Sequence, residues 1–145
     1  MRSLLLATAL VLIAGPLSAQ DDSLLHFAIR TALDPGFESR PVICVGIRRS
    51  PDGPMEDYGA QTGGIIEIEG SVFVGHSECE KSARGSFHRA TGRPATVLEI
   101  GLGEAPGVFT VGFHLHGTYA GASECTAHKE DDEWQLGDCR PLWIS

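Results

Sequence analysis

Two histidines, His114 and His116, lie two residues apart in a segment where apolar and polar residues alternate. On a β-strand such a pair projects from one face, with the side chains about 6.5–7 Å apart along the strand. At that spacing both imidazoles can bind one zinc or copper ion, and His128 or Glu124 could supply a third ligand. The alternative is a pair of exposed imidazoles on the polar face of a sheet. We therefore name His114 and His116 as candidate metal ligands and predict no other cofactor.

The segment Gly75–Cys79 reads Gly-His-Ser-Glu-Cys, close to the G-x-S-x-G motif that holds a nucleophilic serine between a strand and a helix. No helical pattern follows it, and a cysteine replaces the last glycine. We interpret it as the end of a strand whose cysteine forms a disulfide. Glu67 and Glu69 share one face of a predicted strand, where we expect exposed surface carboxylates rather than an acid–base pair. The sequence predicts no catalytic residue.

Basic side chains gather in one segment of an otherwise acidic chain, whose formal net charge is −8. Acidic residues crowd the C-terminal end, from Glu124 to Asp138. The net charge opposes binding to the phosphate backbone of nucleic acids. We predict instead that the basic segment contacts an acidic surface of another envelope or secreted protein, through Lys81, Arg84, Arg89 and Arg93.

Export of the chain is predicted from its first nineteen residues. Arg2 precedes an apolar run from Leu4 to Ala14, and the small residue Ala19 offers a cleavage site before Gln20. The apolar run is shorter than the about 20 residues that span a bilayer, so we expect cleavage and no membrane anchor. We therefore predict a signal peptide over 1–19, one domain over 20–145, and a periplasmic or secreted location.

The four cysteines are even in number, which in an exported chain indicates disulfides. Segments 123–129 and 134–139 flank a polar turn and predict a β-hairpin. If Lys129 faces Trp134, a bulge at Gly137 brings Cys139 opposite Cys125. We therefore predict the pairs Cys125–Cys139 and Cys44–Cys79. A zinc site is the alternative, but no C-x-x-C pair supports it.

One helix followed by many strands predicts an α+β fold. We expect a helix capped by Ser23 and ending before Asp34-Pro35-Gly36, and a long loop over 48–64 with a helical turn near 55–58. The other predicted strands cover 41–47, 65–69, 71–74, 95–101 and 109–115. The helix would pack across the apolar face of a curved antiparallel sheet.

This order of elements resembles the cystatin-like and NTF2-like superfamily of α+β domains. The chain also resembles uncharacterised exported bacterial proteins, in the segments 40–44, 77–79 and 91–95 and in Trp134 and the ending Trp143-Ile144-Ser145. NTF2-like enzymes have three N-terminal helices around a pocket, whereas one is predicted here. The resemblance implies a fold and carries no functional residues.

We interpret the chain as a non-enzymatic domain that binds another protein, as an inhibitor, an immunity-like protein or an accessory subunit. The missing catalytic set and the separated basic and acidic segments support this interpretation. A metal- or small-ligand-binding module using His114 and His116 is the first alternative. An enzyme with a shallow NTF2-like pocket is the second.

Overall fold

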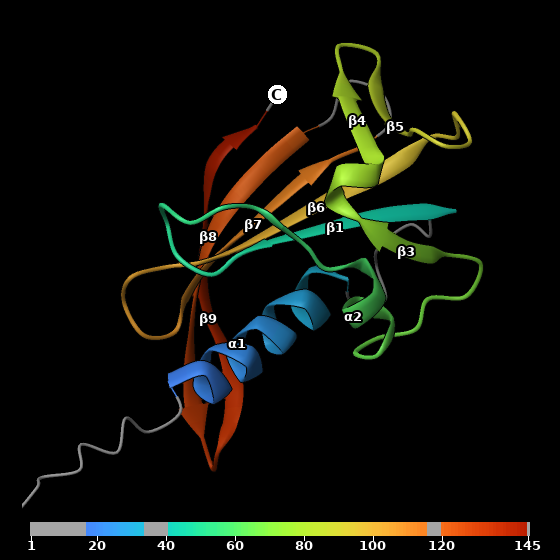
Figure 1. Ribbon diagram of the computed structural model, residues 1–145. Helices are drawn as coiled ribbons and strands as arrows, with labels where there is room; N and C mark the ends of the chain where they lie inside the picture. Colours follow the sequence, from blue (N-terminus) through green and yellow to red (C-terminus); the bar gives the residue numbers. More distant parts are fainter. Residues whose placement is uncertain (1–16, 34–40, 116–119, 145) are drawn as a thin grey trace, which may run out of the picture.

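The computed structural model describes residues 17–33, 41–115 and 120–144, with side chains from Asp22 onward. Its fold is mixed α+β and consists mostly of sheet (Figure 1). A seven-stranded sheet has the order β2-β1-β6-β7-β8-β9, with β3 also paired to β1, and β4 and β5 form a separate hairpin. The elements are α1 (Leu17–Ala32), β1 (Val42–Arg48), β2 (Glu56–Asp57), α2 (Gly59–Gly63), β3 (Val72–Gly75), a 3-10 turn η1 (His76–Glu78), β4 (Cys79–Ser82), β5 (Gly85–His88), β6 (Ala95–Leu102), β7 (Val108–His114), β8 (Ala120–Glu130) and β9 (Glu133–Ile144).

The sheet is antiparallel from β6 to β9, as the sequence predicts, but β1 pairs in parallel with both β6 and β3. Parallel neighbours need a long crossover connection. The segment with β2 and α2 connects β1 to β3, and the segment with η1, β4 and β5 then leads from β3 to β6 on the other side of β1. β1 is buried along nearly its whole length, as expected for a strand covered on both faces. The parallel pairs were not predicted, since short apolar strands carry no signal of their direction.

Helix α1 packs on one face of the sheet, over β6 and β7. Leu25 and Ile29 are fully buried there, and the ring of Phe27 meets Phe109 edge-on at 6.2 Å between centroids. The predicted cap at Ser23 is wrong, because the helix begins at Leu17. The Ser23 hydroxyl instead accepts a hydrogen bond of 2.9 Å from the indole of Trp134. That contact ties the helix to the last strand.

The segment 65–69, predicted as a strand, is irregular and belongs to no strand. The amides of Ile65 and Ile66 both donate to the carbonyl of Thr62, at 2.9 and 3.1 Å, so they follow α2 without joining the sheet. The side chains of both isoleucines pack against the core from this irregular segment. The sequence pattern of such a segment is the same as that of a strand. Glu67 and Glu69 are therefore not strand neighbours. The helical turn of the long loop lies at 59–63 instead of 55–58.

The hairpin of β8 and β9 confirms the predicted register, with Lys129 opposite Trp134 and Cys125 opposite Cys139. The register shifts between Cys125 and Ala127, so that Gly137 and its neighbour form the bulge. Cys125–Cys139 and Cys44–Cys79 are both disulfides, with Cα atoms 4.1 and 6.2 Å apart. Two disulfides are typical of a chain folded in an oxidising compartment. Within the described ranges, no helix is long and apolar enough to cross a membrane.

Candidate functional site

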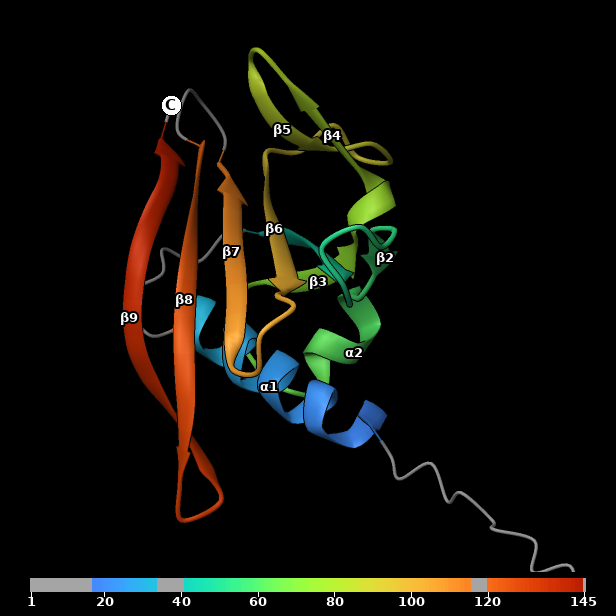
Figure 2. The same cartoon turned by 90° about the vertical axis from the view of Figure 1, so that its left-hand side faces the viewer.

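The face of the sheet opposite α1, here called the outer face, carries the polar side chains of Arg48, Glu99 and His114. The strand register aligns Gly46, Glu99, Gly112, Ala122 and Trp143 in one row across it. At one end, over β1 and β6, the segment η1–β4–β5 covers this face. Its hairpin then extends past the end of the large sheet (Figure 1 and Figure 2). The Cys44–Cys79 disulfide joins that segment to β1. Towards β9 the outer face is open.

Glu99 lies at the border between the covered and the open part. Its Oε1 accepts hydrogen bonds from Nε2 of His76 at 2.8 Å and from Nζ of Lys81 at 2.5 Å. The bond from His76 and then that from Lys81 lower the pKa of Glu99 to about 2, although burial opposes the shift. The His76 ring packs against Gly46, where an added Cβ would lie 2.8 Å from its Cδ2. Glu99 is thus an ionised carboxylate held by two donors.

Ser77 of the Gly-His-Ser-Glu-Cys segment is not arranged as a nucleophile. Its amide and hydroxyl donate to Asp57 at 2.7 and 2.5 Å, and these bonds lower the pKa of that carboxyl. His76, the adjacent residue, is engaged with Glu99. Cys79 is disulfide-bonded, as predicted. The motif therefore builds a turn that anchors η1 to β2.

His114 lies on the outer face beside Trp143, with ring centroids 5.8 Å apart. Burial, and then the positive charge of Lys81, lower the pKa of His114. Its predicted partner His116 lies outside the described residues. The two suggested third ligands have other partners, since His128 approaches Glu130 at 3.4 Å and Glu124 accepts from Arg140 at 2.8 Å. No cluster of three metal-ligating side chains occurs within the described part of the chain, and the metal site stays a prediction.

The open part of the outer face contains a groove of about 160 Å³, here called the outer groove. Gly112 and Ala122 form its floor, Thr110 lies over Gly101 at one end, and Leu142 and Trp143 border it. A second cavity of about 410 Å³ continues along the same face and shares Arg48, Gly101 and Thr110 with it. Small floor residues leave room for a ligand to lie directly on the strands.

Arg48 lines both of these cavities. Its Nε is buried and, among the described residues, has no hydrogen-bond partner. Two of the three acids that line these cavities are engaged elsewhere, Glu99 by His76 and Lys81, and Glu124 by Arg140. A buried donor without a partner is uncommon in folded proteins and calls for an explanation.

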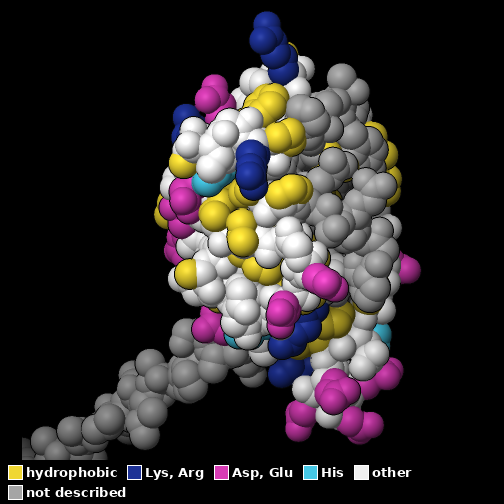
Figure 3. Space-filling model, turned by 90° about the vertical axis from the view of Figure 1, so that its right-hand side faces the viewer, with side chains coloured by type: hydrophobic (Ala, Val, Ile, Leu, Met, Phe, Trp, Pro, Cys, Tyr) yellow, Lys and Arg dark blue, Asp and Glu magenta, His cyan; other side chains and the backbone are white. Residues whose placement is uncertain are grey.

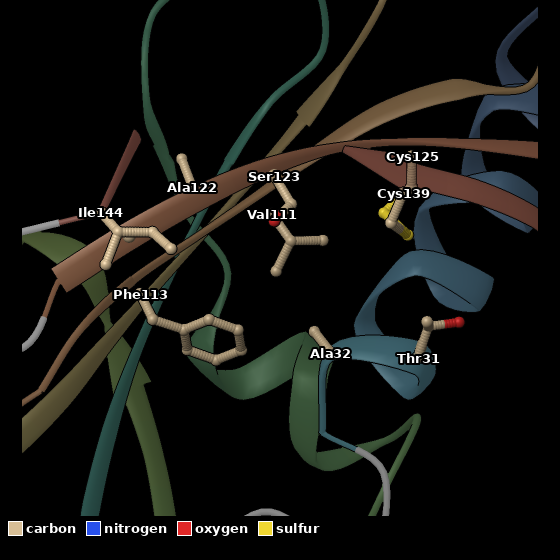
Figure 4. A pocket seen from close by; sticks show the side chains of 10 residues that line it. Thr31, Ala32, Val111, Phe113, Ala122, Ser123, Cys125, Cys139 and Ile144 are labelled. Carbon is tan, nitrogen blue, oxygen red and sulfur yellow. A yellow bond between two sulfur atoms is a disulfide. The ribbon is translucent and has the colours of Figure 1, made fainter. Parts of the chain in front are cut away.

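The opposite, inner face holds a pocket of about 330 Å³ between the end of α1 and strands β7 to β9 (Figure 4). Val111, Phe113, Ile144 and the Cys125–Cys139 disulfide line it, and the hydroxyls of Thr31 and Ser123 are polar exceptions. None of the described lining residues is ionisable. This pocket suits an apolar group and offers no acid or base.

The four predicted partner-binding residues differ in their surroundings, and their role stays a prediction. Lys81 turns to Glu99, and Arg89 approaches Glu80 at 3.7 Å. Arg84 and Arg93 are exposed, and no ion pair involves them in the described ranges. In Figure 3 acidic side chains gather at the tip of the β8–β9 hairpin with basic ones beside them, and further basic side chains project at the opposite end.

The sequence reasoning missed Arg48, His76, Glu99 and Trp143 as parts of one surface. One signal was available, because Glu99 interrupts the apolar run Ala-Thr-Val-Leu-Glu-Ile. A single charge inside a buried strand indicates either an edge or a satisfied carboxylate. The residues that satisfy it come from β4 and η1, which no local pattern identifies.

No protein family model matches the chain, and neither a curated protein sequence nor a solved structure matches it at a significant level. The resemblance to cystatin-like and NTF2-like domains therefore stays a prediction. Function is inferred from the geometry of the described residues.

Proposed function

We propose that this chain is an exported, non-enzymatic domain that binds another secreted or envelope protein through the open part of its outer face. One observation carries the proposal: Leu142 and Trp143 are 47% and 45% exposed beside a groove with a glycine floor. Large apolar side chains side by side on a surface are typical of interaction sites. Tryptophan in particular is enriched among the residues that dominate binding energy.

The surroundings of Trp143 also suit a protein interface. Arg48, Thr110 and the Glu124–Arg140 pair provide a polar border around the apolar centre. Interfaces commonly combine such a border with an aromatic centre depleted of charge. The partner we infer therefore presents an apolar projection flanked by a carboxylate, which Arg48 can meet.

The experiment replaces Leu142 by a photo-reactive amino acid, keeps Trp143, and irradiates the mature protein in an envelope extract of the producing cells. We expect one discrete adduct, which persists across a range of salt because the contact is largely apolar. The matched control carries the same group at Val72, which is 57% exposed on β3 at the other edge of the sheet. Trp143→Ala should weaken capture of the purified partner by about 100-fold, as hot-spot residues do. Equal crosslinking from positions 142 and 72 would contradict the proposal.

A small-ligand module is the second candidate, favoured by the inner pocket. Its volume of about 330 Å³ falls within the range of ligand sites, and its lining suits an aliphatic or aromatic group. The test uses a fluorescent apolar probe. Loss of probe binding in Val111→Trp protein, with binding kept in Val72→Trp protein, would support a ligand site in the inner pocket. The same lining offers no support to an enzyme with an NTF2-like pocket.

We propose further that the helix on its curved sheet is a cystatin-like or NTF2-like arrangement, and that the protein is periplasmic or secreted. Packing of α1 on β6 and β7 supports the first statement, and the two disulfides support the second. Sequencing of the N-terminus of the exported protein tests the signal peptide. The expected first residue is Gln20, and an intact Met1 would contradict the assignment.

A further inference from the structure

We propose that Arg48 binds a carboxylate whose attached apolar group lies in the outer groove. The inference rests on the surface named in the proposed function and specifies the chemistry of the group that binds there. Two sources share this chemistry: a free organic acid with a flat apolar body, and the C-terminus of a peptide ending in an apolar residue.

The first argument is the state of the Arg48 side chain. It extends from the last residue of β1 into the wall of both cavities, and its buried Nε has no partner among the described residues. A guanidinium presents its N–H groups in a planar fork that matches the two oxygens of a carboxylate. A bound carboxylate would satisfy the Nε donor that the described residues leave unpaired.

The second argument is the neighbouring donor. Thr110 lies on β7 opposite Gly101, and its hydroxyl occupies the space above that glycine, 2.6 Å from where a Cβ would stand. It lines both cavities, as Arg48 does. Because Gly101 has no side chain, the Thr110 hydroxyl fits over it. The hydroxyl and the Arg48 guanidinium therefore border the same two cavities. A ligand oxygen there can accept from both groups.

The third argument is the shape of the floor. Gly112 and Ala122 follow one another across β7 and β8, and Trp143 is next in the row. A planar or thin apolar group can rest on the backbone of these strands and contact the indole. The apolar body of the ligand therefore extends from Arg48 towards Trp143.

Charge selects a monoanion over a phosphate. Glu99, Glu104 and Glu124 line the two cavities, and the chain has a net charge of −8. Two of these acids are neutralised by cations of the protein, which leaves Arg48 as the positive group available to a ligand in the described lining. A single negative charge is matched by Arg48, whereas a dianion would meet repulsion from the remaining acid.

The test follows the Arg48 Nε–H signal by NMR while 3-phenylpropionate is added to the full mature protein. We expect this signal to shift with the acid and to stay in place with the neutral 3-phenylpropionamide. Inorganic phosphate should bind at least about tenfold more weakly than the acid. A peptide ending in phenylalanine is compared with its C-terminal amide, so that tighter binding of the free acid or of the peptide acid identifies the source.

Variants assign the site. Arg48→Gln should weaken binding of the acid by about tenfold or more, and Arg48→Lys should weaken it less, since it keeps the charge without the fork. Gly112→Ala should also weaken binding, because its Cβ enters the groove while the nearest protein atom is 3.7 Å away. Gly63→Ala, with nothing within 4 Å, is the matched control.

Equal binding of the acid and its amide would overturn the inference, as would unchanged binding of the acid in folded Arg48→Gln protein. Failure of the partner crosslink with successful binding of the acid would contradict the proposed docking alone. Loss of acid binding with a successful crosslink would contradict this inference alone.

Discussion

Glu99 shows how one charged residue can be accommodated within a buried strand. Its side chain is 23% exposed, and it remains ionised because His76 and Lys81 both donate to it. These two donors come from η1 and β4, so the carboxylate also fastens the β4–β5 segment to the outer face. Lys81 is 39% exposed but has this partner within the chain, and the partner-binding role predicted for it from the basic segment stays a prediction.

Glu99→Gln should lower the free energy of unfolding by about 1–3 kcal/mol near pH 7. The folded pKa of Glu99, about 2, lies below its ordinary value of 4.5, so the stabilisation is complete above pH 4.5 and is lost as the pH falls towards 2. Urea denaturation should therefore show the difference between the two proteins shrinking over that interval. Exposed Glu67→Gln is the control, and a difference that persists unchanged at pH 2 would refute this account.

Helix α2 shows how closely two elements of this fold approach each other. A Cβ added at Gly59 would lie 2.1 Å from the backbone carbonyl carbon of Val74 in β3, whereas one at Gly63 would meet nothing within 4 Å. The two glycines belong to the same short helix. Only the first is required by packing, and the sequence alone does not distinguish them.

Gly59→Ala should therefore destabilise the protein by about 1–3 kcal/mol, since backbone atoms of β3 would have to move. Gly63→Ala should leave stability unchanged or raise it by about 0.5 kcal/mol, because alanine favours the helix. Thermal and urea unfolding of the two variants provide the comparison. Similar losses from both substitutions would show that the close packing of α2 on β3 does not determine their effect.

The elements were predicted unevenly, for physical reasons that differ between them. The β8–β9 register followed from sequence because a short turn, a bulge glycine and a disulfide leave one alignment. Strand β7 followed from strict alternation of apolar residues. The segment 65–69 did not, because isoleucines that pack irregularly on a core have the same composition as a strand.

The large sheet ends in β9, an edge strand of twelve residues whose side chains are mostly exposed. Open edges of this length invite pairing with another chain. The Cα separation of 4.1 Å between Cys125 and Cys139 marks a pair without direct backbone hydrogen bonds, so Ser123–Pro141, two positions along, is another. The nitrogen of Pro141 therefore faces away from β8, where it withholds a donor from any added strand.

Pro141→Thr should restore an N–H on this edge and strengthen self-association by about tenfold, through pairing of β9 with β9 of a second copy. Sedimentation velocity over a range of concentrations measures the change. Pro51→Thr, in the turn after β1, is the control for loss of a proline elsewhere. An unchanged sedimentation coefficient in the Pro141 variant would mean that other features protect the edge.

The sequence by itself determined the α+β class, the hairpin register and the Cys125–Cys139 pair, because these follow from local periodicity or from short separations along the chain. The Cys44–Cys79 pair followed as the one that remained, although 35 residues separate its cysteines. The tertiary structure decided the rest. It made β1 parallel to β3 and β6, brought His76 and Lys81 onto Glu99, and left Nε of Arg48 without a partner among the described residues, in the groove that Trp143 also lines. These groups lie far apart along the chain, and their meeting depends on strand order and on a crossover that no local pattern encodes. The outer groove therefore depends on the order of the strands, whereas the hairpin and its disulfide can be predicted from residue spacing.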